Sequence, residues 1–355
     1  MSRTIPYRVE PVVVTALLAV VWTADPVRAG ERLVPSEYAT IQAGINACVN
    51  GDVVIIAPGT YTGDGNRDLD FGGKRITVRS TDPNDPNVVA ATVINCEASP
   101  SEYHNGFYFH TGEDANSVVD GLTITNAGGG LFAGITCTAI YCENSSPTIR
   151  RCVIRQNLSY KYGGGVYCSN SGATLDRCTI RDNYAASDGG GVYWQNSSGL
   201  GPKIINCTIC GNGALLGNGG GIYSKSAGLA IANCTIANNA TGKTCGGIYV
   251  SSGGTATATN CIVWNNTVGQ IYGTGATVGY SDVQGGYTGE GNINADPCFV
   301  DANTPDPNFA DYHLTSTSPC INTGDPNGNY TGPVSYTHLR AHETPEHLVC
   351  RLLLE

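Results

Sequence analysis

The chain has 355 residues, of which 47 are glycine and only 14% are charged, and its formal net charge is −10. This acidic balance argues against nucleic-acid binding, because the phosphate backbone repels it. The regular internal pattern described below excludes a disordered chain, and one domain of this length can bury a large core.

The first 29 residues have the pattern of a signal peptide. Arg3 and Arg8 precede an apolar run over 12–22, and small residues before the end of the segment suit cleavage after Ala29. The apolar run is too short for a membrane span. We therefore expect an exported protein, secreted or at the cell surface, with no membrane span.

The region 64–116 is the longest irregular part of the chain. Asp68 and Asp70 stand two residues apart in a glycine-rich stretch, where they either stabilise a turn or form a metal or acid/base pair. His104 and His110 flank a strand-like run and could serve acid/base chemistry. No partner for either histidine is visible in the sequence, which favours a surface or packing role.

A short phrase occurs five times in the middle of the chain. It begins with a cysteine and ends with an asparagine, as in CTIRDN from Cys178, and the five cysteines are 26, 29, 27 and 27 residues apart. A strand-like repeat of this length predicts a stack of coils. The copies begin at Cys152, Cys178, Cys207, Cys234 and Cys261.

A second phrase, GGGVYC or a close variant, alternates with the first, so each coil holds at least two strands. Because side chains alternate across a strand, each cysteine and the branched residue two positions later face inward. We expect the inward cysteines to be stacked free thiols, since neighbours on parallel strands are poorly placed for a disulfide. Cys298 and Cys320 are the better disulfide candidates. The final asparagines of the first phrase predict a hydrogen-bonded ladder at one corner: Asn157, Asn183, Asn212, Asn239 and Asn266.

The repeat resembles the right-handed parallel β-helix proteins, the pectate-lyase-like superfold, and the handedness is implied by this resemblance. The stretch 34–63 looks like the opening of that family, which implies a short helix with Ile41, Ile45 and Cys48 on its inner face. The stretch 296–326 resembles the closing segment of bacterial surface members. The expected fold is therefore an all-β right-handed parallel β-helix with a short N-terminal capping helix.

The expected order is a signal peptide (1–29), a cap (30–52), coils (53–283), a closing segment (284–333) and a non-native tail (334–355). The tail is assigned on composition, because the chain from 335 onward lacks glycine and holds three of the six histidines.

Outward positions of two adjacent coils predict a basic patch. Arg151, Arg155, Arg177 and Arg181 would repel one another unless an anion met them. One interpretation is an acidic polysaccharide, whose carboxylates suit the planar guanidinium fork. The other is a solvated face on which Asp176 and Asp182 pair with the arginines. The substrate-binding candidates are Arg151, Arg177, Lys161, Tyr160, Tyr162, Trp194, Asn206 and Asn233.

The resemblance also implies a possible enzyme. In pectate-lyase-like enzymes an Arg or Lys removes a proton next to a carboxylate while Ca²⁺ neutralises the charge. Arg181 or Arg155 would be the base here, and the candidate calcium ligands would be Asp176, Asp182 and Asp188. No cofactor is certain. The signatures of polygalacturonase-type glycosidases are absent from the sequence.

Two functions remain open. The short insertions between coils favour a binding surface. The alternation of the two phrases favours it as well, because it also resembles the repeats of bacterial polymorphic outer-membrane proteins. We expect an exported, monomeric protein that binds an extracellular or cell-wall polysaccharide, with an acidic polymer preferred. The alternative is a polyuronate lyase that acts by calcium-assisted β-elimination.

Overall fold

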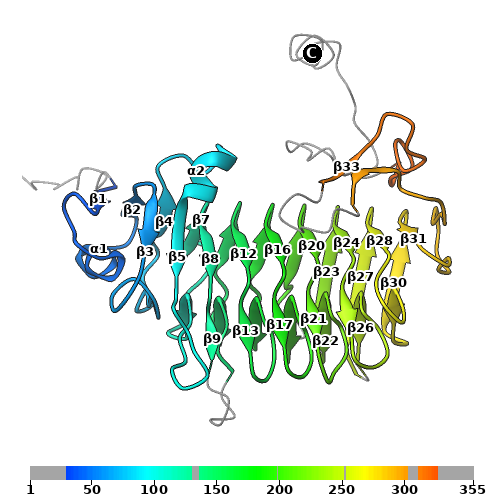
Figure 1. The fold of residues 1–355 in the computed structure, drawn as a ribbon, viewed down its shortest axis with the longest axis horizontal. Helices are drawn as coiled ribbons and strands as arrows, with labels where there is room; N and C mark the ends of the chain where they lie inside the picture. The colour runs from blue at the N-terminus through cyan, green and yellow to red at the C-terminus, as the bar shows by residue number, and fades with distance from the viewer. Residues whose placement is uncertain (1–28, 130–135, 198, 252, 303–310, 327–355) are drawn as a thin grey trace, which may run out of the picture.

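The computed structural model describes residues 29–129, 136–197, 199–251, 253–302 and 311–326. These residues form a stack of parallel coils along one long axis (Figure 1), which confirms the predicted all-β parallel solenoid. Apart from Ala29, the predicted signal peptide lies outside the described residues, as does the predicted tail. Within the described residues, no helix is long and apolar enough to cross a membrane.

Four parallel sheets form the walls of the stack, and the two longest, sheets A and B, run along most of its length. Sheet A contains β1 Glu31–Val34, β2 Val53–Ile56, β4 Thr77–Ser80, β7 Val118–Asp120, β11 Thr148–Arg150, β15 Thr174–Asp176, β19 Lys203–Ile205, β23 Gly228–Ala232, β27 Thr255–Thr259 and β30 Ala276–Gly279. Sheet B contains β3 Gly59–Tyr61, β5 Thr92–Asn95, β8 Thr123–Thr125, β12 Val153–Arg155, β16 Thr179–Arg181, β20 Thr208–Cys210, β24 Thr235–Ala237, β28 Ile262–Trp264 and β31 Asp282–Val283.

The other two sheets are shorter. Sheet C contains β6 Phe107–Phe109, β10 Ile140–Glu143, β14 Val166–Ser169, β18 Val192–Gln195, β22 Ile222–Lys225, β26 Ile248–Val250 and β29 Ile271–Tyr272. Sheet D contains β9 Gly128–Gly129, β13 Leu158–Ser159, β17 Tyr184–Ala185, β21 Gly213–Ala214 and β25 Ala240–Thr241. The remaining elements are helices α1 Ile41–Ala47 and α2 Pro86–Ala91 and the antiparallel strands β32 Phe299–Asp301 and β33 Asp311–Leu314.

Equivalent residues of successive coils pair with one another, so the repeat becomes a set of columns. Ile154, Ile180 and Ile209 are register partners on sheet B and are fully buried. They belong to one apolar cluster that runs through the inside of the stack. Burying one such side chain contributes roughly 1.5–3 kcal/mol, so the core grows with each added coil.

The repeated cysteines form a column of buried free thiols, as predicted. The backbone N–H of Cys178 donates to Sγ of Cys207, and that of Cys207 donates to Sγ of Cys234, both at 3.4 Å. Burial raises the thiol pKa values well above their ordinary value, so these side chains are inert. The disulfide prediction is wrong: Cys298 and Cys320 are both free, and the thiol of Cys320 donates to Oδ2 of Asp282 at 3.0 Å.

The asparagine ladder is also confirmed. Nδ2 of Asn183 donates to Oδ1 of Asn212 at 3.0 Å and to the carbonyl of Ile154 at 2.9 Å. The same bonds recur along the ladder, whose members are all buried. Each amide therefore satisfies backbone groups at a tight corner that water does not reach.

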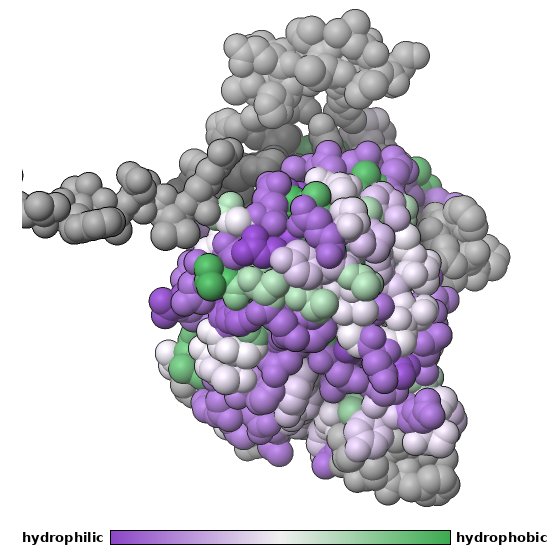
Figure 2. Space-filling view, turned by 90° about the vertical axis from the view of Figure 1, so that its left-hand side faces the viewer, coloured by the Kyte–Doolittle hydropathy of each residue, from purple (hydrophilic) through white to green (hydrophobic). Residues whose placement is uncertain are grey.

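The first coil of the core is covered, and the outer face of sheet B is covered in part. Helix α1, which the side chain of Thr40 caps, buries Ile41 and Ile45 over the first coil, as expected of a capping helix. The end of the molecule that faces the viewer in Figure 2 is largely polar, with only small separate apolar areas. Nearer the C-terminal end of the stack, β33 folds back on the outer face of sheet B, where Tyr312 packs against Cys210 of β20 and Ala237 of β24 (Figure 1). The domain boundaries between these parts stay predictions.

Candidate functional site: a tyrosine row and a polar cleft

The outer face of sheet C carries a continuous row of stacked tyrosines. One tyrosine comes from each strand, and successive ring centroids lie 5.0–5.6 Å apart. The row forms because the glycine phrase places its tyrosine at the outward position of every copy, between two inward residues. We call it the tyrosine row; its members are Tyr108, Tyr141, Tyr167, Tyr193, Tyr223, Tyr249 and Tyr272.

The rings stack on one another, and Tyr167 and Tyr193 are buried, so a ligand would meet mainly the edges and hydroxyls of the other members of the row. Several hydroxyls already bond to polar neighbours: Tyr193 donates to Oε1 of Gln195 at 3.2 Å, and Nε2 of Gln195 donates to the hydroxyl of Tyr167 at 2.7 Å. Burial raises the pKa of Tyr223 to about 12 and raises that of Tyr167 as well. The row therefore presents protonated phenols, which both donate and accept hydrogen bonds.

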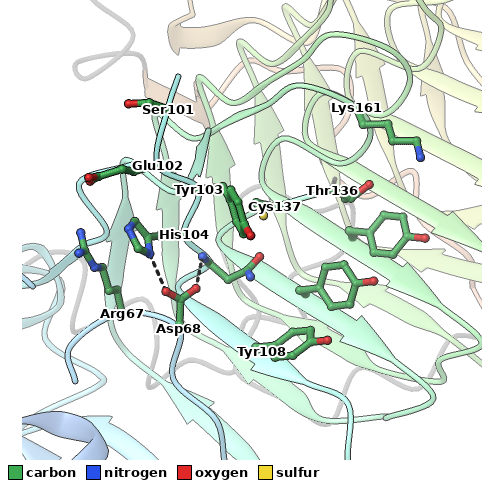
Figure 3. A pocket seen from close by; sticks show the side chains of 13 residues that line it. Arg67, Asp68, Ser101, Glu102, Tyr103, His104, Tyr108, Thr136, Cys137 and Lys161 are labelled. Carbon is green, nitrogen blue, oxygen red and sulfur yellow. Dashed lines mark hydrogen bonds and ion pairs between the residues drawn. The ribbon is translucent and has the colours of Figure 1, made fainter. Parts of the chain in front are cut away.

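A cleft of about 930 Å³ lies at the N-terminal end of the row (Figure 3). Its floor includes three members of the row, and its walls come from the irregular region and from the turn that holds Lys161. The side chains that line it are mostly polar or aromatic, among them Arg67, Asp68, Glu102, Tyr103, His104, Asn105, Tyr108, Tyr141, Lys161 and Tyr167.

Asp68 and His104 form a close pair in this cleft. Nδ1 of His104 lies 2.6 Å from Oδ2 of Asp68, and the backbone N–H of Asn105 donates to Oδ1 of the same carboxylate at 2.7 Å (Figure 3). Asp68 has a positive φ of 52°, a conformation that aspartate tolerates in a tight turn. Sequence reasoning selected both residues but did not pair them.

A second pair of the same kind lies outside the cleft lining. Nε2 of His110 is 3.3 Å from Oδ2 of Asp70, and the imidazole stacks on the ring of Tyr108 with centroids 4.1 Å apart. Asp68 and Asp70 thus each hold a histidine, although the carboxylates are only two residues apart. No partner was visible for these histidines in the sequence because the partners lie 36 and 40 positions away.

The predicted basic patch is largely neutralised within the chain. Nε of Arg150 and Nε of Arg151 donate to the buried carboxylate of Asp120 at 2.8 and 2.9 Å. Arg177 pairs with Asp176 at 2.7 Å, and Arg181 with Asp182 at 2.6 Å. The predicted pairs of Asp176 and Asp182 with arginines are therefore present, and binding of a glycan to this face stays a prediction.

Arg155 and Arg181 are register partners on the outer face of sheet B. Nη1 of Arg155 donates to Oε1 of Gln156 at 2.7 Å. Burial and the neighbouring Arg181 lower the pKa of the Arg155 guanidinium. Helix α2 covers one end of this face through Val89, whose carbonyl accepts from Thr123, and the β32–β33 hairpin covers the other end (Figure 1).

The three predicted calcium ligands do not meet. Asp176 ends β15 on sheet A, Asp182 follows β16 on sheet B, and Oδ1 of Asp188 accepts from the backbone of Asn218 near sheet C. Among the residues that the structure describes, no group of three acidic, histidine or cysteine side chains is placed to hold a metal ion. These aspartates therefore do not form the expected shared site.

The prediction that Trp194 binds substrate is wrong. Its indole is fully buried and donates to the carbonyl of Ser171 at 2.9 Å, so it cannot contact a ligand. It points inward because it replaces the cysteine of the glycine phrase, and it fits because its register partners are the small residues Cys168 and Ser224. Tyr162 stacks on Tyr193, outside the row, and Tyr160 lies partly exposed in the same turn.

Lys161 lines the cleft, and its ammonium lies 5.5 Å from the ring centroid of Tyr162. Asn206 and Asn233 belong to a corner column between sheets A and B. Nδ2 of Asn206 donates to Oδ1 of Asp176 at 3.1 Å, and Nδ2 of Asn233 donates to Oδ1 of Asn206 at 3.1 Å. Their contact with a polysaccharide stays a prediction, since both amides already bond to the coil before.

The family model described as "Right handed beta helix region" matches residues 66–209 and 134–284, which together span more than half of the chain. The chain belongs to this family. Among solved structures, the pectate lyase Pel9A is similar to this β-helix protein with a TM-score of 0.51 and 15% identity, covering 88% of this chain and 95% of that chain. This likeness confirms the pectate-lyase-like fold and shows the fold alone.

A pectin methylesterase from Aspergillus niger aligns with a TM-score of 0.38 and 13% identity over 76% of this chain and 84% of that one, which is too distant to support an argument. No curated protein matches the sequence.

Proposed function

We propose that this β-helix protein is exported and binds an extracellular or cell-wall polysaccharide, which lies along the tyrosine row and enters the cleft. The observation that carries the proposal is the continuity of the two features. Tyr108, Tyr141 and Tyr167 belong to the row and also line the cleft. One extended ligand can therefore contact both.

A polymer suits such a row better than a small molecule does. The coils are spaced about 4.8 Å apart, and the members of the row other than the buried Tyr167 and Tyr193 offer a ligand with repeating units the same kind of contact more than once. Tyrosine supplies a large rigid surface at low entropic cost, and its hydroxyl both donates and accepts, as sugar hydroxyls require. Glycan binding is the function for which these properties are jointly suited.

Basic side chains at the cleft favour an acidic polymer. Arg67 and Lys161 lie at opposite sides of the cleft in Figure 3. Arg67 also contacts Asp64 and Glu97, at 3.2 and 3.7 Å, and the ammonium of Lys161 lies over the ring of Tyr162, so either cation would meet a uronate carboxylate in addition to the contacts it already makes. The fold shared with a pectate lyase is compatible with such a ligand.

Binding to polygalacturonate, alginate, hyaluronan and a neutral glucan tests the proposal by affinity electrophoresis and calorimetry. The double variant Tyr141→Phe/Tyr167→Phe removes two hydroxyls from the row and keeps the rings. A hydrogen bond contributes roughly 0.5–1.5 kcal/mol, so we expect about a tenfold loss of affinity. Tyr184→Phe, on an exposed ring of sheet D outside the row, is the matched control and should change nothing. Equal losses in both variants, or none in the double variant, would contradict the proposal.

A polyuronate lyase remains the second candidate, because the pKa of Arg155 is lowered and because β12 and β16, which end in Arg155 and Arg181, lie between α2 and the hairpin (Figure 1). In that case the elimination would require Ca²⁺ and would disappear in Arg181→Ala. The experiment of the next subsection separates this mechanism from a different one.

A further inference from the structure

We infer that His104, held by Asp68, is a general base that removes a proton from a uronate residue in the cleft and so drives a β-elimination. This inference rests on the proposed function, since it requires a polysaccharide in the cleft. It assigns a catalytic role to a pair on the sheet C side of the molecule, away from the arginines of sheet B.

The hydrogen bonds around His104 leave one nitrogen for a substrate. In the neutral form of the ring, the contact with Asp68 places the proton of His104 on Nδ1 and the lone pair on Nε2, because an ionised carboxylate only accepts. Within the described residues, the imidazole makes its side-chain hydrogen bond through Nδ1 alone. A base held by an orienting carboxylate is the arrangement that proton abstraction requires.

The pair is also rigid. The backbone of His104 both donates to and accepts from Gly128 of β9, at 3.0 and 2.8 Å. Asp68 is tied to Asn105 in both directions: its backbone N–H donates to the carbonyl of Asn105 at 2.8 Å, and its carboxylate accepts the bond described above. Asn105 in turn accepts from the backbone of Thr138 at 3.0 Å. A base fixed by its backbone and by its partner can act without rearrangement.

The same cleft contains the other groups that the reaction needs. The C5–H bond of the uronate breaks and its proton passes to Nε2 of His104, while the electron pair forms the C4=C5 double bond. The bond from C4 to the glycosidic oxygen breaks, and the leaving oxygen takes the phenolic proton of Tyr103, whose half-exposed ring lies beside His104 (Figure 3). Lys161 offsets the charge of the uronate carboxylate, and the protons exchange with water afterwards.

The pair Asp70–His110 provides a matched control. It consists of the same two residue types, on the same two segments of chain, but it does not line the cleft. The substitutions His110→Gln and Asp70→Asn therefore repeat the chemical change at a pair that does not line the cleft, although His110 stacks on Tyr108 of the row.

The experiment follows the ultraviolet absorbance of unsaturated uronate ends on polygalacturonate, alginate and hyaluronan, with and without a calcium chelator, and measures binding in parallel. We expect elimination that survives the chelator. His104→Gln should lower kcat by about 100-fold or more, and Asp68→Asn by about 10- to 100-fold with KM unchanged, while both controls retain full rate. Added imidazole should partly restore His104→Ala, which a merely structural role would not allow.

Three results would overturn the inference, and each has a distinct meaning. Binding without any new unsaturated ends would remove catalysis and leave the binding function standing. Elimination that needs Ca²⁺ and is lost in Arg181→Ala but kept in His104→Gln would establish the arginine mechanism instead. A lack of binding to every polymer would remove the proposed function, and the inference with it. Circular dichroism and unchanged glycan affinity of His104→Gln show that the variant is folded.

Discussion

The central coils and the first coils of this protein are attached to their neighbours in different ways. Between β11 and β28, residues of the same type contact one another in successive coils: the cysteines, the asparagines and the tyrosines each bond to or pack against their equivalents in the next coil. In the first coils, unlike side chains reach between segments far apart, as Asp68 does to His104. Glu113 does the same, accepting from Gly73, Thr111 and Ser145.

The repeated columns determine the shape of the molecule, whereas the irregular first coils provide the residues suited to chemistry. A column of identical side chains extends indefinitely and offers every coil the same surface, so it builds length and a repeated ligand contact. A site with distinct roles needs residues that occur once. In this protein they occur where the repeat is imperfect, in the region 64–116 that lines the cleft.

The largest effect is expected from a substitution in the central coils, at the one position of a column where the side chain differs strongly in size from its neighbours. Trp194 is the one residue of its column that is large while both register partners are small. Trp194→Ala opens a cavity and leaves the carbonyl of Ser171 without its partner, so we expect a loss of about 3–5 kcal/mol in the free energy of unfolding. Denaturant titration measures it, with Tyr184→Ala as the exposed aromatic control. A loss below about 1 kcal/mol would show that the column closes over the gap.

A somewhat smaller effect tests the ladder itself. Asn212→Ala removes the acceptor for both the backbone N–H and Nδ2 of Asn183 and the donor to the carbonyl of Ile180. Buried polar groups left unpaired cost about 1–3 kcal/mol each, with partial relief, so we expect a loss of about 2–4 kcal/mol. Asn46→Ala on the exposed face of α1 should stay within about 0.5 kcal/mol. Similar values for both variants would remove the ladder as a stabilising feature.

Periodicity explains what could be predicted from the sequence. It indicated the coil stack and the buried Cys178 and Asn183 columns because inward positions recur at a fixed spacing and only one register buries them. Applied to the glycine phrase as well, the same alternation would have placed Tyr193 outward and Trp194 inward. The tyrosine row was therefore visible in the sequence, and the assignment of Trp194 to a ligand surface was avoidable.

The cleft was not predictable in this way. His104 meets Asp68 across 36 positions because two turns of the irregular region happen to close on each other, and no period relates those turns. The partners of the arginines were predictable only in part. Asp176 and Asp182 are sequence neighbours of Arg177 and Arg181 and were foreseen as partners, whereas Asp120 reaches Arg151 from the preceding coil and was not.

The smallest of these effects tests how the first coils are joined. Glu113 is buried, which by itself raises its pKa, but the hydrogen bonds from Gly73, Thr111 and Ser145 outweigh burial and lower the pKa below its usual value. A carboxyl whose pKa is depressed on folding stabilises the fold above its unfolded pKa, about 4.3 for glutamate, and loses that contribution as the pH falls through the folded value.

Glu113→Gln replaces an acceptor oxygen by a donor that meets N–H groups, so we expect a loss of about 1–3 kcal/mol at neutral pH. Because the substituted side chain no longer titrates, the decline of stability below about pH 4 should be shallower than in the parent protein. Denaturant titrations at a series of pH values measure both effects, with the exposed Glu31→Gln as control. Parallel acid limbs in Glu113→Gln and the parent would mean that the ionisation of Glu113 does not contribute to the stability of the first coils.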